Sequence, residues 1–230
     1  MKLQSFSIVC YICIMRAKLI ILDFDGTLGD TREIILRTNK ELLTLKGYPI
    51  PSDRVILDTV GLPLEQCFLA MFPDFPREKL PEWVAAYRQI FEDLRSTVGP
   101  SLFPGVMETL EQLYRKGYRL SVASSRGRAS LRSLLSDLGL AEYICYALGK
   151  EDVFPAKPDP EPVLKTLRDL GYSAGETLVV GDMPVDILMG VRAGARTCGV
   201  SYGNSSREAL LEAGADFVID EFSELAGHLE

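Results

Sequence analysis

Residues 18–28 read Lys-Leu-Ile-Ile-Leu-Asp-Phe-Asp-Gly-Thr-Leu, and this stretch decides the fold. A continuous apolar run that ends in an acid is typical of a strand buried on both faces of a parallel sheet. Because residues two apart in an extended chain face the same side, Asp23 and Asp25 are expected to point into one site. Gly26 allows a sharp turn after the strand, and Thr27 adds a hydroxyl and an amide at that turn.

The rest of the chain alternates strand-like and helix-like segments. Apolar runs predict further strands at residues 119–124, 143–148, 177–181, 197–200 and 217–219. Amphipathic patterns between them predict helices at residues 106–116, 128–138, 161–170, 185–193 and 206–213. This alternation indicates an α/β fold with a doubly wound, Rossmann-like parallel sheet.

Residues 29–98 interrupt the alternation. They hold helical patterns at 33–46, 64–72 and 80–96 and no strand-like pattern. An α-helical segment inserted directly after the first strand is expected to cap the C-terminal edge of the sheet, where α/β sheets bind ligands. We therefore predict a discontinuous catalytic core of residues 16–28 and 99–230 with a helical cap of residues 29–98.

The first 15 residues are predicted to lie outside both parts. Their apolar run from Phe6 to Met15 is too short to span a bilayer. A signal peptide fits poorly, because no small-residue cleavage site separates this run from the first strand. We expect residues 1–15 to be a disordered extension or the product of a misplaced start, with Met15 as the true initiator, and we expect no membrane partner.

Composition excludes several classes of protein. The net charge of −7 over 230 residues, without a long basic run, argues against nucleic acid as a partner. Five cysteines at irregular spacings are not a disulfide framework and suit the cytoplasm. The one histidine, His228, leaves acid–base work to carboxylates, lysine or tyrosine. We expect a cytoplasmic monomer or weak homodimer.

Two further acids follow a predicted strand. The segment from Val179 reads Val-Val-Gly-Asp-Met-Pro-Val-Asp, which places Asp182 at the end of a buried strand and Asp186 in the first turn of a helix. An unpaired acid at a buried strand end is costly unless it meets a cation, whereas Asp186 also stabilises the helix as a first-turn acid. A ligand set made only of oxygens indicates Mg²⁺.

Two loops offer groups that could bind phosphate. Ser124, Ser125 and Arg126 follow the second predicted strand, where hydroxyls and loop amides can hold phosphate oxygens. A Ser-Ser pair before a helix is also an ordinary N-cap. Lys157 lies in Ala-Lys-Pro-Asp-Pro, a loop stiffened by two prolines, so its ammonium group is expected to be held in place.

Taken in chain order, these segments resemble the motifs of the haloacid dehalogenase-like superfamily, and the resemblance covers residues 18 to about 225. It implies that Asp23 is the nucleophile, that Asp25 is the general acid and base, and that Lys157 offsets negative charge. It also implies Mg²⁺ bound by Asp23, Asp182 and the carbonyl of Asp25, with Asp186 as a further candidate ligand. The predicted substrate-binding residues are Thr27, Ser124, Ser125, Arg126 and Lys157.

Within the superfamily, Lys157-Pro-Asp-Pro and Gly199-Val-Ser-Tyr-Gly203 resemble the phosphoglycolate phosphatase and phosphate-releasing pyrophosphatase branches. We therefore predict a Mg²⁺-dependent phosphatase acting on a small phosphorylated metabolite, phosphoglycolate-like, through an aspartyl-phosphate. An inorganic pyrophosphatase and a hexose-phosphate mutase stay open, since both would share these motifs. A haloacid dehalogenase has no need of Asp25, and a non-catalytic binding module would tolerate losses among the motif residues.

Three other patterns fit different chemistries. Gly199–Gly203 matches the nucleophile elbow of a serine esterase using Ser201, with Asp220 and His228 following in the right order. Cys10 and Arg16 have the spacing of a cysteine phosphatase loop, but an apolar run without glycine cannot surround a thiolate with free amides. Cys10 and Cys13 could form a redox pair, although no βαβ pattern surrounds them.

Overall fold

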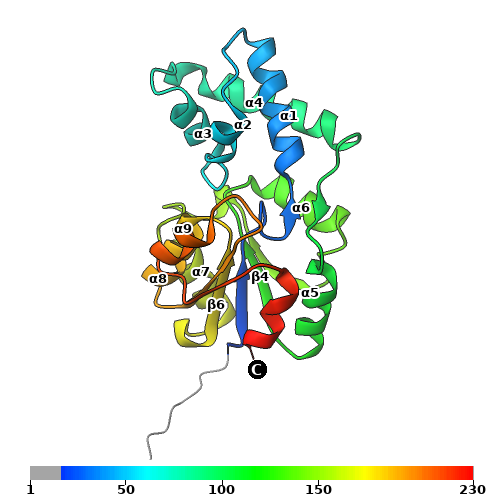
Figure 1. Cartoon of the computed structure of the whole chain (residues 1–230), viewed down its shortest axis with the longest axis vertical. Helices are drawn as coiled ribbons and strands as arrows, with labels where there is room; N and C mark the ends of the chain where they lie inside the picture. Colours follow the sequence, from blue (N-terminus) through cyan, green and yellow to red (C-terminus); the bar gives the residue numbers. More distant parts are fainter. Residues whose placement is uncertain (1–16, 230) are drawn as a thin grey trace, which may run out of the picture.

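The computed structural model describes residues 17–229 (Figure 1). Its core is a six-stranded sheet of order β5-β4-β1-β6-β7-β8 in which every neighbouring pair is parallel. The strands are β1 (Leu19–Leu22), β4 (Arg119–Ala123), β5 (Ile144–Leu148), β6 (Thr177–Gly181), β7 (Arg196–Val200) and β8 (Phe217–Ile219). The predicted parallel α/β sheet is confirmed, with β1 at its centre.

Helices cover both faces of this sheet, because β1 is apolar on both of its sides. The helical segments of the core are α5 (Val106–Arg115), α6 (Arg128–Asp137), η2 (Lys150–Asp152), α7 (Glu161–Leu170), η3 (Ala174–Glu176), α8 (Pro184–Arg192), α9 (Arg207–Glu212) and η4 (Phe222–His228). Ile20 and Leu22 pack in one buried cluster with α5, α6 and the C-terminal 3₁₀ segment η4. Leu19 and Ile21 pack in a second cluster with α7 and α8. The doubly wound arrangement is therefore confirmed.

The inserted segment forms a helical cap at the top of Figure 1. Its elements are α1 (Arg32–Leu45), α2 (Asp53–Leu57), α3 (Leu64–Met71), η1 (Arg77–Lys79) and α4 (Leu80–Arg95). The cap has its own buried cluster, in which Trp83 packs edge-on against Phe68 and Phe75 with ring centroids 5.5 and 4.7 Å away. These side chains bury apolar surface away from the sheet, so the cap holds a core of its own.

The expectation that residues 29–98 lack strands is wrong in one detail. β2 (Gly29–Asp30) pairs antiparallel with β3 (Ser101–Leu102), which joins the two crossings between core and cap. Strands of two residues leave no alternating pattern, so periodicity could not reveal them. Helix α2 was also missed, because its five residues are too few to show a helical period. The boundaries at 28/29 and 98/99 stay predictions, and residues 1–15 lie outside the part that the structure describes.

The sheet brings three strand ends to one edge, below the cap. The backbone amide of Asp23 donates to Val180 of β6, and that of Ser124 donates to Leu148 of β5, both at 2.9 Å. Asp182 follows β6 directly. Because parallel strands end at the same edge, these side chains converge. In residues 17–229 no helix is both long and apolar enough to cross a membrane.

Candidate active site

Three buried carboxylates meet at this edge. Asp23, Asp182 and Asp186 each offer an oxygen within 4.8 Å of the others, and their exposed fractions are 6%, 0% and 1%. Burial, together with the charges of Asp186 and Asp182, raises the pKa of Asp23 well above its ordinary value, despite the opposing effect of Lys157. A cation would relieve this repulsion, so the donor set fits a hard divalent ion such as Mg²⁺.

Lys157 lies between two of these acids. Its ammonium group donates to Asp23 Oδ1 at 2.6 Å and to Asp186 Oδ1 at 2.7 Å, and its side chain is 3% exposed. Burial alone would lower the pKa of Lys157, but the charges of Asp186 and Asp23 outweigh it and raise that pKa. The lysine is therefore a fixed positive charge beside Asp23.

Asp186 has two structural roles in addition to its place in the cluster. Its Oδ1 accepts from Lys157, and its Oδ2 accepts from the backbone amide of Met183 at 3.1 Å, which caps the first turn of α8. The helix-stabilising role considered from the sequence is thus present together with the candidate metal role.

Within residues 17–229, the hydrogen-bond donors to Asp182 are all neutral. Its Oδ2 accepts from the backbone and side-chain nitrogens of Asn204, each at 2.8 Å, and its Oδ1 accepts from Thr27 at 3.4 Å. Burial and the charge of Asp186 raise the pKa of Asp182 to about 7. A Cβ atom at Gly26 or Gly203 would lie 2.2 or 2.3 Å from this side chain, so both glycines make room for it.

Asp25 points to a different set of partners. Its carboxylate accepts from Arg126 Nε at 3.0 Å, from the Arg126 Nη2 group and from Thr31 Oγ1 at 2.7 Å. The Arg126 guanidinium also lies over the Phe91 ring at 4.8 Å. Two parallel N–H···O contacts orient a carboxylate firmly. The Asp25 carboxylate therefore points to Arg126 and Thr31 and not into the cluster of Asp23, Asp182 and Asp186, although Asp25 follows the same strand as Asp23.

Ser124 and Ser125 form hydrogen bonds with different partners. Ser124 is 6% exposed and its Oγ accepts from the backbone amide of Arg126 at 3.1 Å, which shapes the loop. Ser125 Oγ donates to the carbonyl oxygen of Gly61 in the cap at 2.5 Å. Helix α6 begins after Gly127 without a side-chain cap, so neither serine is its N-cap.

A cavity of about 340 Å³ lies between the cap and the core. Asp23, Asp25, Ser124, Ser125 and Arg126 line it, together with residues of α1, α3, α4 and the loop before α3. Two of the predicted substrate-binding residues, Thr27 and Lys157, are absent from its lining. Thr27 contacts Asp182, and Lys157 contacts Asp23.

Sequence reasoning missed several polar residues of this region. Thr31 contacts Asp25, Asn204 contacts Asp182, and Asn39 lines the cavity. One signal was available for Asn204, because it directly follows the Gly199–Gly203 segment. Asn39 lies in a pattern that is typical of an ordinary amphipathic helix and Thr31 lies just before it, so only the fold shows which way they face.

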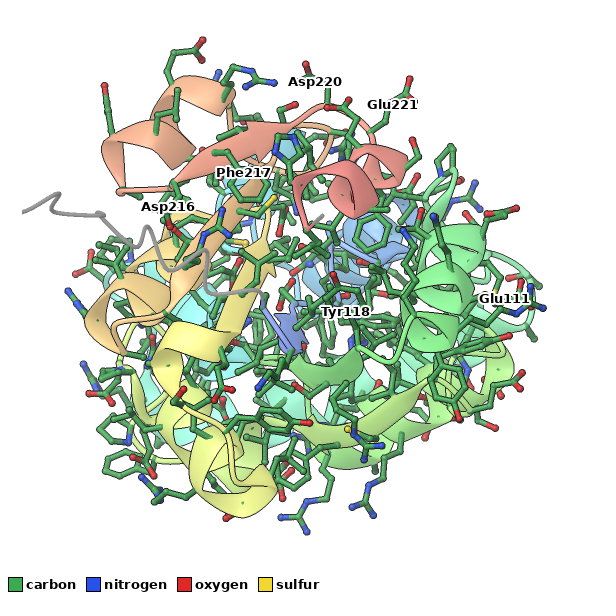
Figure 2. The ribbon with its side chains drawn as sticks, turned by 90° about the horizontal axis from the view of Figure 1, so that it is seen from below. Glu111, Tyr118, Asp216, Phe217, Asp220 and Glu221 are labelled. Atoms are coloured by element: carbon green, nitrogen blue, oxygen red, sulfur yellow. The ribbon has the colours of Figure 1, made fainter. Side chains whose placement is uncertain are left out.

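In the structure, Ser201, Asp220 and His228 do not form the catalytic triad of an esterase. Ser201 Oγ donates directly to the Asp220 carboxylate and to the carbonyl oxygen of Ile219 at 3.2 Å. His228 stacks instead on the ring of Phe217, with centroids 4.4 Å apart (Figure 2 labels Phe217 and Asp220). In a catalytic triad the histidine lies between the serine and the acid. Cys10, Cys13 and Arg16 lie outside the described residues.

Comparison with known proteins decides the family. A family model described as haloacid dehalogenase-like hydrolase matches residues 20–200. The chain belongs to the haloacid dehalogenase-like hydrolases. The resemblance inferred from the motifs is therefore confirmed, and the protein is a hydrolase of this family.

Relatives of this haloacid dehalogenase-like hydrolase match nearly its whole length. It is 37% identical over 212 residues to "Probable phosphatase IndB" of Dickeya dadantii, covering 91% of this chain and 92% of the relative. It is 30% identical over 206 residues to a phosphoglycolate phosphatase of Yersinia pseudotuberculosis, with coverages of 88% and 89%. A structure named a predicted phosphoglycolate phosphatase from Haemophilus somnus matches with a TM-score of 0.87, 21% identity and coverages of 94% and 100%, which shows the shared fold.

Proposed function

We propose that this haloacid dehalogenase-like phosphatase hydrolyses a small phosphate monoester through an aspartyl-phosphate on Asp23, with Mg²⁺ as its cofactor. The observation that carries the proposal is the position of Asp23. Its buried carboxylate lines the cavity and at the same time belongs to a cluster of three acids and one lysine. A nucleophile beside fixed positive charge is the arrangement that phosphoryl transfer requires.

The acid cluster would hold the metal. Asp23, Asp182 and Asp186 supply carboxylate oxygens, and the resemblance adds the carbonyl of Asp25. When bound, a divalent cation offsets the charge on the phosphoryl oxygens. Lys157 supplies further positive charge at Asp23, and the Ser124 hydroxyl, which lines the cavity, would donate to a phosphoryl oxygen.

The reaction divides into two steps. In the first, a carboxylate oxygen of Asp23 attacks phosphorus while the bond to the leaving oxygen breaks, and Asp25 gives that oxygen a proton. In the second, Asp25 takes a proton from water as the water cleaves the aspartyl-phosphate. The contacts from Arg126 and Thr31 keep the Asp25 carboxylate next to the cavity, which supports this role.

A phosphate-release assay tests the proposal against its alternatives. Turnover of phosphate monoesters with one phosphate released per ester would support the phosphatase. Faster turnover of pyrophosphate would favour the pyrophosphatase, and isomerisation of a sugar 1-phosphate without net phosphate release would favour the mutase. The cytoplasmic location and the monomeric or weakly dimeric state stay predictions.

We expect Asp25→Asn to slow both steps and to let the phosphorylated enzyme accumulate, because the general base is lost while Asp23 remains. Incubation with acetyl phosphate followed by mass spectrometry of the intact protein should reveal one added phosphoryl group. As a control, Asp23→Asn should show none under the same conditions. If Asp25→Asn hydrolyses its substrates at the wild-type rate, Asp25 is not the acid and base.

We expect activity to require Mg²⁺, and Asp182→Ala to raise the Mg²⁺ concentration needed for half-maximal activity more than Asp186→Ala does. In the described part of the chain the hydrogen-bond donors to Asp182 are neutral, so its charge is available to a cation, whereas Lys157 already pairs with Asp186. Titration of Mg²⁺ after chelator treatment measures the effect. The control is Asp169→Ala, since Asp169 forms an exposed ion pair with Lys165 outside the acid cluster. Better turnover with Zn²⁺ than with Mg²⁺ would contradict the oxygen-ligand argument.

A further inference from the structure

The cavity has a polar part and a larger apolar part. Asp23, Asp25 and Ser124 lie at the reacting end of the sheet, and apolar side chains of the cap supply much of the remaining wall, together with several paired charged residues. These apolar residues come from α1, from the loop before α3, from the start of α3 and from α4: Ile35, Val60, Leu62, Leu64 and Phe91. A wall of this kind binds the non-reacting part of a ligand through buried apolar area.

The cations that line the cavity are already paired. Each contacts a carboxylate of the protein, in the pairs Arg126–Asp25, Lys150–Glu65 and Arg88–Glu151. Glu92 is one more acid in the lining. Among the described residues, therefore, no cavity-lining cation is left without a carboxylate partner. A second negative group on the substrate would therefore have to compete with a protein carboxylate for one of these cations.

The other polar groups of the lining are neutral. Burial raises the pKa of the Cys67 thiol to about 11 and also raises the pKa of Tyr87, so both side chains stay uncharged near neutral pH. Asn39 donates through Nδ2 to Ile35, while its buried Oδ1 has no hydrogen-bond partner in residues 17–229. An acceptor oxygen at this place repels an anion and suits a hydroxyl or N–H group.

The volume also exceeds what the smallest substrates fill. A cavity of about 340 Å³ holds several groups of the size of a water molecule at once. It falls near the lower end of the range for small-molecule pockets. A glycolate group or a second phosphate would leave much of the apolar wall uncovered.

We propose that the substrate is a phosphate monoester of an uncharged alcohol or phenol whose apolar body fills the cap side of this cavity, rather than phosphoglycolate or pyrophosphate. The inference rests on the phosphatase function proposed above. Its physical basis is that a second anion would have to share or displace a cation that already pairs with a protein carboxylate, whereas an apolar group gains free energy from burial without that cost. It departs from the phosphoglycolate-like substrate expected from sequence resemblance.

Matched substrate pairs test this on the full-length enzyme with Mg²⁺. Benzyl phosphate and 4-carboxybenzyl phosphate differ only in one remote carboxylate, and we expect kcat/KM to favour benzyl phosphate at least about a hundredfold. Along ethyl, butyl and hexyl phosphate, kcat/KM should rise about fourfold per methylene. Phosphoglycolate and pyrophosphate should both be poorer than ethyl phosphate.

Acetyl phosphate separates the two levels of the proposal, because its small reactive leaving group reports on Asp23 alone. Turnover of acetyl phosphate together with equal or better use of 4-carboxybenzyl phosphate would overturn the substrate class and leave the phosphatase function intact. Failure with acetyl phosphate and with every ester would overturn the phosphatase function itself.

A cation placed in the wall should shift the preference. In Leu62→Arg the new guanidinium lies on the cavity side of the cap, so the benzyl to carboxybenzyl ratio should fall at least tenfold. Leu45→Arg is the matched control, since Leu45 is 69% exposed on α1 and outside the cavity lining, and it should keep the wild-type ratio. A folded Leu62→Arg enzyme with the wild-type ratio would contradict the proposed position of the leaving group. If Leu62→Arg does not fold, the wild-type substrate pairs decide.

Discussion

Asp23→Asn is expected to lower phosphate release by at least about a thousandfold while the protein stays folded. The amide is a poor nucleophile and a weaker ligand for a divalent cation, so both proposed roles of Asp23 are lost. Steady-state assays with acetyl phosphate and with the best monoester measure the loss, and circular dichroism checks the fold.

The stability of this variant follows from the electrostatics of the cluster. The pKa of Asp23 is raised in the folded protein, so its negative charge near neutral pH opposes folding when no metal is bound. Removing that charge leaves Lys157 paired with Asp186 at 2.7 Å. We therefore expect the melting temperature of Asp23→Asn without Mg²⁺ to equal or exceed that of the wild type, and the stabilisation by added Mg²⁺ to shrink.

Asp220→Asn provides a control with the same chemical change. Asp220 contacts Ser201 and Arg207 and its side chain is 65% exposed, so kcat/KM should stay within about twofold of the wild type. The same variant would lose activity if Ser201 and Asp220 formed an esterase site. A well-folded Asp23→Asn enzyme that keeps a tenth of the wild-type rate would exclude Asp23 as the nucleophile.

The second large effect is expected for Lys157→Met. Methionine keeps most of the volume but leaves Asp23 and Asp186 buried without their shared cation. Removing one partner of a buried ion pair typically costs about 3–5 kcal/mol, which for a chain of this size lowers the melting temperature by on the order of 10 °C. Activity should fall at least about a hundredfold, because a fixed positive charge next to the nucleophile is gone.

Magnesium distinguishes this explanation from simple loss of packing. A divalent cation in the acid cluster would offset part of the missing charge, so Mg²⁺ should raise the melting temperature of Lys157→Met more than that of the wild type. Lys165→Met is the surface control, since Lys165 pairs with Asp169 at 2.8 Å on the exposed side of α7 and such pairs contribute under about 1 kcal/mol. Equal melting temperatures for Lys157→Met and wild type in chelator would refute the charge argument.

Much of the core could be predicted because its elements are marked by local patterns. The predicted strands at 177–181 and 217–219 coincide with β6 and β8, and the helix at 161–170 coincides with α7. β1 ends at Leu22, earlier than the apolar run suggests, although Asp23 still donates its amide to Val180 of β6 and Phe24 packs in the core. Apolar periodicity identifies buried elements well and their last residues poorly.

The sequence by itself determined most of the strands and helices along the chain, the helical insert, and the acids and lysine at the strand ends, because each depends on residues that are neighbours in the chain. Only the tertiary structure decided which of these groups meet. It paired Lys157 with Asp23 across 134 residues and Arg126 with Asp25 across 101. It also showed that the Phe24 ring occupies the space beside Gly29, where a Cβ atom would lie 3.0 Å from it. Contacts between distant segments depend on how the faces of several elements pack together, and no local pattern records that packing.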